Sequence, residues 1–335
     1  MKHNLSLDLV DRLTGRLISS PSTTKAMPGP LSQTGVRPAT SVGSAPKAQP
    51  WLSIIIPVYN SWSTLPNCLE SLMRQRGVPP FEILVVDDGS VEPPAVIRNR
   101  IVQFKIKMLR QNHSGVSVAR NHGIELASGE ILMFIDSDCT ARKGCLASVM
   151  KTVPTHPGDQ AFQLHVVGDR SYPVGRAEEL HLETVQRHKL DATGRILWLN
   201  TAGFVLRNQK SWVSNLFDAR ALRGQDTELL ARLLASGKHP IFLPDAVVEH
   251  HPDLTVWKYL VKALRSGYRA ARTMEIMETY KVKWDSTARE RFEMFQSMWT
   301  MSRQSSLGHQ AFFVTAATRL LIKIGHVAYK IKWFV

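Results

Sequence analysis

Two aspartates separated by one serine follow an apolar run in this chain. The run is residues 131–135, and the carboxylates belong to Asp136 and Asp138. Side chains alternate along an extended segment, so both aspartates are predicted to face one side, with Ser137 turned away. Buried carboxylates are costly without a cationic partner, and hard divalent cations bind carboxylates together with substrate phosphates. The pair therefore predicts a Mn2+ or Mg2+ site that stabilises a diphosphate leaving group. The alternative is a loop with solvated carboxylates.

A second acidic pair, Asp87 and Asp88, closes another apolar run and is followed by Gly89 and Ser90. Carboxylates at that place can accept hydrogen bonds from a nucleotide base or from ribose hydroxyls, and Gly89 permits a tight turn near a ligand. The alternative is a turn stabilised by an aspartate side chain.

Asp226 lies where the amphipathic stretch "TELLARLLASGKHP" begins. Aspartate is a good helix N-cap, and held at a helix start it can also act as a general base on an acceptor hydroxyl. Glu228, two residues later, is expected to face solvent.

Two other residues are candidates for the same chemistry. His250, in the pair His250–His251, is a candidate metal ligand or a structural histidine. Arg120 lies between the acidic segments, in "RQNHSGVSVARNHG". It is expected to pair with a phosphate or with one of the aspartates, or to lie on a helix surface.

The elements that position these residues alternate along the chain. Strands are predicted in "WLSIIIPVYN", "FEILVVDDGS" and "EILMFID", and helices in "STLPNCLESLMRQ" and "GVSVARNHGIELA". This order is typical of βαβ units on a parallel sheet. Ligands bind beyond the carboxyl ends of such strands, and both acidic pairs lie at those ends. Further strands are predicted near 161–167 and 196–206.

Composition divides the chain into three parts. Residues 1–50 are rich in Ser, Thr, Pro and Gly and are predicted to be a disordered basic tail. Residues 51–253 are predicted to be the catalytic domain, and residues 254–335 a basic, mainly helical extension. The two flanks carry most of the net charge of +14. Residues 1–50 contain six Lys/Arg against two acidic residues, and residues 254–335 contain fourteen against five. A near-neutral body with basic flanks argues against a nucleic-acid-binding core.

The cysteines and the termini bear on the compartment. Cys68, Cys139 and Cys145 have no CxxC spacing, which favours a reducing compartment over a disulfide scaffold. No secretory signal and no uncharged run of spanning length is expected. We therefore predict a cytoplasmic protein, with peripheral contact at the inner face of the membrane as a further expectation.

Five segments in order resemble the family 2 glycosyltransferases, which have the GT-A fold. They are "SIIIPVYN", "ILVVDDGS", "NHSGVSVARNHGIELASGE", "ILMFIDSDC" and "GQDTELLARL". The resemblance covers roughly residues 51–251. It implies an α/β nucleotide-binding sheet and inverting transfer from a nucleotide sugar, with UDP favoured, to a hydroxyl of a glycan or lipid-linked acceptor.

The resemblance also implies roles for individual residues. Pro57, Tyr59 and the Asp87–Asp88 turn would hold the donor nucleotide, together with Arg120 and Asp136. Asp136 and Asp138 would be the DxD motif that binds the metal, Asp226 the general base, and His250 a histidine near the metal. The family often has Glu before the base, where this chain has Gln225.

Two other classes are weighed against this one. A nucleotidyltransferase would need a Gly-rich, basic phosphate loop, and "PVYNSWSTL" contains neither glycine nor a basic residue. A catalytically degenerate binding or scaffold protein is the remaining alternative, and the intact carboxylates argue against it.

The C-terminal stretch "AFFVTAATRLLIKIGHVAYKIKWFV" mixes apolar residues with lysine and arginine. It is expected either to lie on an anionic membrane surface as a basic amphipathic helix or to pack on the catalytic domain.

Overall fold

The computed structural model describes residues 49–93, 95–103, 106–213, 215–280 and 287–331. The predicted tail at residues 1–50 therefore lies almost entirely outside the described residues. Eight strands form one sheet: β1 Leu52–Val58, β2 Phe81–Asp87, β3 Lys107–Arg110, β4 Ile131–Phe134, β5 Cys139–Ala141, β6 Ala161–Gly168, β7 Phe204–Arg207 and β8 Ile241–His250.

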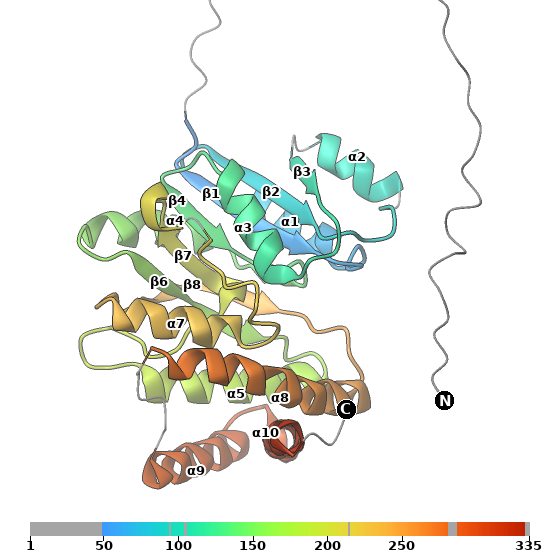
Figure 1. Ribbon diagram of the computed structural model, residues 1–335, viewed down its shortest axis with the longest axis vertical. Helices are drawn as coiled ribbons and strands as arrows, with labels where there is room; N and C mark the ends of the chain where they lie inside the picture. The colour runs from blue at the N-terminus through green and yellow to red at the C-terminus, as the bar shows by residue number, and fades with distance from the viewer. Residues whose placement is uncertain (1–48, 94, 104–105, 214, 281–286, 332–335) are drawn as a thin grey trace, which may run out of the picture. The chain divides into compact units, whose positions relative to one another are not determined.

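The helices alternate with the strands and then dominate the C-terminal part (Figure 1). Their bounds are α1 Leu65–Met73, α2 Ala95–Gln103, α3 Val116–Leu126, α4 Cys145–Thr152, α5 Pro173–Lys189, α6 Lys210–Val213, α7 Gln225–Ala235, α8 Val256–Glu278, α9 Ala288–Gln304 and α10 Gly308–Lys330, with short 3-10 turns at Val153–Thr155 and Thr201–Gly203.

The sheet is parallel on one side and mixed on the other. Its strand order is β3-β2-β1-β4-β7-β6-β8-β5. The strands from β3 to β4 are mutually parallel, whereas β7 is antiparallel to both of its neighbours. The parallel half confirms the predicted βαβ units, and the α/β GT-A-type sheet expected from the sequence is the fold found.

Alternating side chains of β1 divide the core between the two faces of the sheet. Ile54 and Ile56 pack in a cluster with residues of α1, α2 and α4. Ile55 packs in a second cluster with residues of α3 and α7. Because successive strand residues point to opposite faces, a run with no polar residue after Ser53 is what a strand covered on both sides requires.

The C-terminal helices pack on the rest of the molecule through α5. Leu180 of α5 is buried with Met298 of α9 and Phe312 of α10. Thr315 of α10 donates a hydrogen bond to the carbonyl oxygen of Ala177 on α5, at 2.9 Å. Figure 1 shows α8, α9 and α10 gathered beside α5. The prediction of a mainly helical extension after residue 254 is confirmed for its described residues, and a domain boundary near residue 253 stays a prediction.

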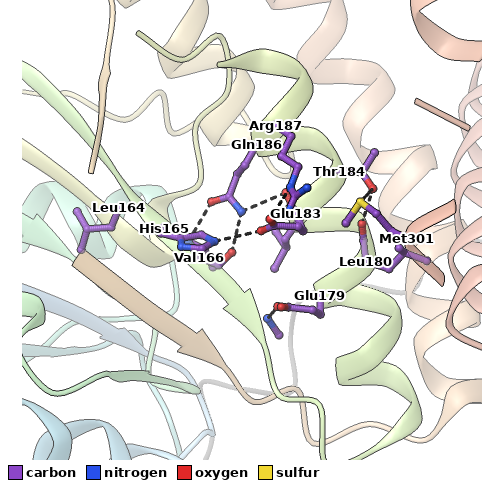
Figure 2. A network of polar contacts seen from close by, with 12 residues as sticks. Leu164, His165, Val166, Glu179, Leu180, Glu183, Thr184, Gln186, Arg187 and Met301 are labelled. Carbon is purple, nitrogen blue, oxygen red and sulfur yellow. Dashed lines mark hydrogen bonds and ion pairs between the residues drawn. The ribbon is translucent and has the colours of Figure 1, made fainter. Parts of the chain in front are cut away.

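Helix α5 is fixed to β6 by polar contacts that the sequence analysis did not predict (Figure 2). The side chain of Gln186 accepts a hydrogen bond from the backbone N–H of Val166 and donates one to its carbonyl oxygen. Glu183 pairs with His165 at 3.2 Å and with Arg187 at 2.6 Å. These contacts set the orientation of α5, which carries a residue of the site described below.

The predicted second half differs from the structure at one strand. The strand predicted at 196–206 is shorter, since β7 begins at Phe204 and a 3-10 turn precedes it. By length and mean hydropathy (1.4), α10 could cross a bilayer, although it carries lysine and arginine and core helices of soluble proteins meet the same criterion.

Candidate active site

Parallel strands bring the two acidic segments to one edge of the sheet. Val58 at the end of β1 pairs with Asp87 at the end of β2, and Ile55 pairs with Phe134 at the end of β4. The carboxyl ends of these strands therefore meet at one edge, as predicted.

The DxD segment forms a turn between β4 and β5. The extended conformation assumed for it is thus wrong, because the strand ends at Phe134. The two aspartates nevertheless line one cavity, and Ser137 lies instead against Ser61, with 2.8 Å between their hydroxyl oxygens. The turn thus brings Asp136 and Asp138 to the same side, which side-chain alternation along a strand was expected to do.

Arg120 is the cationic partner of Asp136. Its guanidinium donates to Asp136 at 2.7 Å, and the arginine itself is buried, with its guanidinium 5.4 Å from the ring centre of Phe217. Arg120 was expected to pair with a phosphate or an aspartate, or to lie on a helix surface. The structure shows the pair with an aspartate, and the expected surface position is wrong. A donor-binding role for this residue stays a prediction.

Asp138 faces His250, which in turn is held by Glu178. The Nε2 of His250 lies 3.2 Å from Asp138, and its Nδ1 lies 2.6 Å from Glu178. Burial alone would lower the pKa of His250, but the charge of Glu178 and the hydrogen bonds to both carboxylates raise it well above its ordinary value. Burial would raise the pKa of Asp138, yet hydrogen bonding and charge from His250 and the charge of Lys262 lower it.

These donors fit a divalent cation. Ligand atoms of Asp138, Cys139 and His250 lie within 4.8 Å of one another. With Glu178 accepting the Nδ1 proton, Nε2 of His250 is directed at Asp138, which is the arrangement that a metal-ligating histidine adopts. Burial raises the pKa of the Cys139 thiol well above its ordinary value, so the thiol is the weakest donor of the three for a hard cation.

His251 points away from this cluster. Its ring lies 2.8 Å from Thr140 and 2.8 Å from Asp169. The adjacent histidines therefore have different partners. Among the described residues, His250 belongs to the candidate metal-binding cluster and His251 does not.

Asp88 organises the loop before α3. Its carboxylate accepts hydrogen bonds from the backbone N–H groups of Ser114 and Gly115, at 2.8 and 2.9 Å, and from the side chain of Gln111. Asp87 is fully buried and accepts from the backbone N–H of Ser90. These contacts give both aspartates the turn-stabilising role that was weighed as the alternative, and contact with a base or ribose stays a prediction.

Gly89 is required by the same turn. Its φ is +76°, and a Cβ there would lie 2.7 Å from the backbone nitrogen of His113. Any other residue would be strained and would push the 111–115 loop away.

Tyr59 and His113 form an exposed aromatic pair next to this loop. Their rings are stacked with centres 4.0 Å apart, and Tyr59 is 49% exposed. His113 also lies 2.9 Å from the Asp88 carboxylate. Pro57, one residue from the end of β1, is partly buried opposite Val86.

Asp226 lies in the first turn of α7 but does not cap it. The helix begins at Gln225, with Gly224 in the N-cap position, so the capping interpretation is wrong. The hydroxyl of Thr201 donates to Asp226 at 2.6 Å. Burial raises the pKa of the Asp226 carboxyl, and the charge of Arg120 and the Thr201 hydrogen bond only partly offset this. A carboxylate with a raised pKa is a better general base.

Glu228 is buried, which corrects the expectation that it faces solvent. It pairs with Arg232 at 2.6 Å and accepts a hydrogen bond from the hydroxyl of Tyr280 at 3.0 Å. The residue fixes α7 against its neighbours, and α7 in turn positions Asp226.

One cavity, of about 590 Å³, contains the candidate catalytic groups. Asp136, Asp138, His250 and Asp226 all line it. A larger one, of about 1110 Å³, lies beside α1 and β5 and shares Asp138 with the first. Residues from the turn between β4 and β5 and from β8, α5, α7, α8 and α10 thus meet in a single site.

Two further residues of the candidate site were not predicted from the sequence. Glu178 lies on α5, and no motif in the sequence marks it. Thr201 comes from "WLNTAGFVLR", and its hydroxyl carries no local signal in the sequence. Both reach the site only because distant segments converge.

Comparison with known proteins agrees with this geometry. Residues 53–212 match the profile described as glycosyl transferase family 2. Glycosyltransferase AglE of Haloferax volcanii is 34% identical over 230 residues, which cover 65% of this chain and 72% of that protein. The chain belongs to glycosyl transferase family 2. As a family 2 member it is also 30% identical over 217 residues to the pre-mycofactocin glycosyltransferase of Mycobacterium tuberculosis, covering 62% of this chain and 44% of that protein.

A solved structure supports the fold alone. The mannosyltransferase PcManGT from Pyrobaculum calidifontis superposes with a TM-score of 0.51 at 16% identity, over 87% of this chain and 89% of its own. This family 2 chain spans only 26–35% of the length of the first curated relatives it matches.

Proposed function

We propose that this glycosyltransferase is metal-dependent and inverting, and that it transfers a sugar from a nucleotide sugar to a hydroxyl of a glycan or lipid-linked acceptor. The observation that supports this most is the shared cavity. It holds Asp226, with its raised pKa, on the same walls as Asp138 and His250.

In the proposed reaction Asp226 takes the proton of the acceptor hydroxyl. The acceptor oxygen forms a bond to the anomeric carbon while the bond from that carbon to the diphosphate oxygen breaks. The nucleoside diphosphate leaves with the electron pair, and the configuration inverts. Thr201 holds one carboxylate oxygen of Asp226 and so orients the other toward the acceptor.

We assign the metal to Asp138 and His250, with Asp136 beside them and Glu178 orienting the imidazole. Bound Mn2+ or Mg2+ would neutralise charge that develops on the departing diphosphate. The mannosyltransferase that shares this fold was solved with GDP-mannose and Mn2+, which supports the assignment.

The nucleotide is assigned to the strand ends. Tyr59 and His113 offer an exposed stacking surface for a base, beside Pro57 and the turn containing Asp87 and Asp88. We further propose a cytoplasmic protein that contacts the membrane through α10.

The test is release of nucleoside diphosphate from a panel of UDP-, GDP- and dTDP-sugars with Mn2+ or Mg2+. One donor should be hydrolysed, and EDTA or Asp138→Ala should abolish the reaction. Asp226→Asn should lower the rate by about 10²–10⁴-fold with nucleotide affinity unchanged, whereas Asp245→Asn, at an exposed site on β8, should match the wild type. A folded protein that binds none of the nucleotides would contradict the proposal and favour the degenerate scaffold.

A further inference from the structure

Four basic side chains line the cavity that contains Asp226. Three come from the C-terminal helices and one from the loop before α7. We call them the basic wall: Arg223, Lys262, Arg319 and Lys323. The proposed reaction gives none of them a role.

The carboxylates of this cavity are already paired with other groups. Asp138 and Glu178 share His250, and Asp226 accepts a hydrogen bond from Thr201. The fourth carboxylate, at the first position of the DxD motif, is held by a buried arginine. Within the part of the chain that the structure describes, no member of the basic wall forms an ion pair with a carboxylate.

Arg319 is the most confined of the four. Its guanidinium donates a hydrogen bond to the sulfur of Met298, at 3.6 Å, and burial lowers its pKa. Burial and the charge of Arg319 also lower the pKa of His181, to about 4, so this histidine is neutral at physiological pH. The Nδ1 of His181 is buried with no hydrogen-bond partner among the described residues. A partly buried cation beside an unsatisfied polar atom is costly unless a ligand binds there.

We propose that the basic wall binds a phosphate group carried by the acceptor, an inference that rests on the proposed function. Arginine and lysine are the usual phosphate ligands. Because the carboxylates of the cavity are paired with other groups, the four positive charges of the basic wall are left for a ligand. The phosphate would lie in the same cavity as Asp226, so it would orient the acceptor for deprotonation. This makes the acceptor class a phosphate ester.

The phosphate has two sources, a lipid phosphate or a small water-soluble phosphate ester. The outer face of α10, together with the residue that follows the helix, carries exposed apolar side chains at helical spacing: Phe313, Leu320, Ile324, Val327 and Ile331. Because α10 has this apolar face on one side and Arg319 on another, the lipid source is the one we test first.

Binding of three probes separates the two sources: methyl phosphate, octyl phosphate and 1-octanol. Affinities would be measured by calorimetry for the full chain and for Arg319→Leu, Arg319→Lys and Lys323→Ala. Lys330→Ala, on the same helix but outside the cavity lining, is the control. UDP affinity with Mn2+ is measured for every variant. Because Lys323 is exposed, its variant keeps the test valid if Arg319→Leu does not fold.

Octyl phosphate is expected to bind, and Arg319→Leu and Lys323→Ala to weaken it at least tenfold while UDP affinity stays unchanged. Arg319→Lys should retain part of the affinity. Octyl phosphate binding more tightly than methyl phosphate, with no binding of octanol, would assign a lipid phosphate. Equal affinities for the two phosphates would support the phosphate site and assign a soluble ester.

Three results would overturn the inference. The first is that the protein binds octanol as tightly as octyl phosphate. The second is that the variants lose UDP affinity in parallel with phosphate affinity. The third is that the protein binds UDP but neither phosphate. The second result would place the basic wall on the donor diphosphate. A protein that binds neither UDP nor the phosphates would instead refute the proposed function.

Discussion

At the residue scale, Glu178 is the group that gives His250 its orientation. The Nδ1 of His250 lies 2.6 Å from Glu178, and this fixes Nε2 toward Asp138. Partners of this kind orient metal ligands, and their loss typically lowers metal affinity about 10–100-fold.

Glu178→Gln should therefore weaken Mn2+ binding by about tenfold or more, measured by calorimetric titration of the purified protein. The control is Glu183→Gln, the same change on the same helix. Because Glu183 pairs with His165 of β6, this variant should leave Mn2+ affinity unchanged. Equal Mn2+ affinity in the Glu178 variant and the wild type would exclude the orienting role.

Thr201 tunes the candidate base. Its hydrogen bond lowers the pKa of Asp226, against the raising effect of burial. A general base must be ionised, so activity falls as the pH drops below its pKa. Thr201→Val removes the donor, which raises that pKa and should shift the acid limb of kcat/KM to higher pH.

The measurement is a pH–rate profile with the donor that the panel identifies. Thr201→Ser retains a hydroxyl and should restore the wild-type acid limb. A Thr201→Val profile that falls in rate at all pH values alike, with no shift of the limb, would show that the threonine does not act through the ionisation of Asp226.

At the element scale, the cavity depends on a close crossing of α8 and α10. A Cβ at Gly325 of α10 would lie 2.1 Å from the backbone oxygen of Leu264 on α8, and one at Gly267 of α8 would lie 2.0 Å from that of Ile322. Glycine at both positions allows the two backbones to touch, and this places Lys262 and Arg319 on the same cavity.

Gly325→Ala should separate these helices and destabilise the protein by about 1–3 kcal/mol, the usual cost of overpacking. Urea unfolding followed by circular dichroism measures the change. Gly158→Ala is the matched control, because a Cβ there meets nothing within 4 Å. Equal stability of the two variants would mean that the crossing relaxes without cost.

At the scale of the whole molecule, α10 serves two surfaces. One side packs on α5 through Thr315 and lines the cavity with Arg319. The other exposes apolar residues, among them Leu320 (59%) and Ile324 (41%). The formal charge of +14 would add attraction to an anionic bilayer. Deleting the helix would also destroy the cavity, so point changes are the better test of membrane contact.

Replacing Leu320 and Ile324 together by serine should reduce flotation with vesicles of phosphatidylglycerol and phosphatidylcholine by at least half, because apolar burial is lost. Phe292→Ser, at an exposed site on α9, controls for general surface apolarity. Vesicles of phosphatidylcholine alone should bind less. Unchanged flotation of the double variant would end the membrane proposal.

The sequence alone determined the parallel half of the fold and the carboxylates of the site. Apolar runs closed by Asp87 and Asp136 are local patterns, and parallel strands necessarily bring their carboxyl ends to one edge. For Asp226 and His250 the local pattern left a structural alternative open in each case, a helix cap and a structural histidine, and only the resemblance indicated their roles.

Only the tertiary structure decided which partner each of these residues has. Glu178 and Thr201 meet His250 and Asp226 across 72 and 25 residues of chain, and side-chain direction at such separations is set by how helices and strands pack. The same holds for Glu228, whose burial follows from contacts of α7 with Tyr280. Local periodicity specifies which face of an element is apolar, but the packing of distant elements determines which polar groups that face encloses.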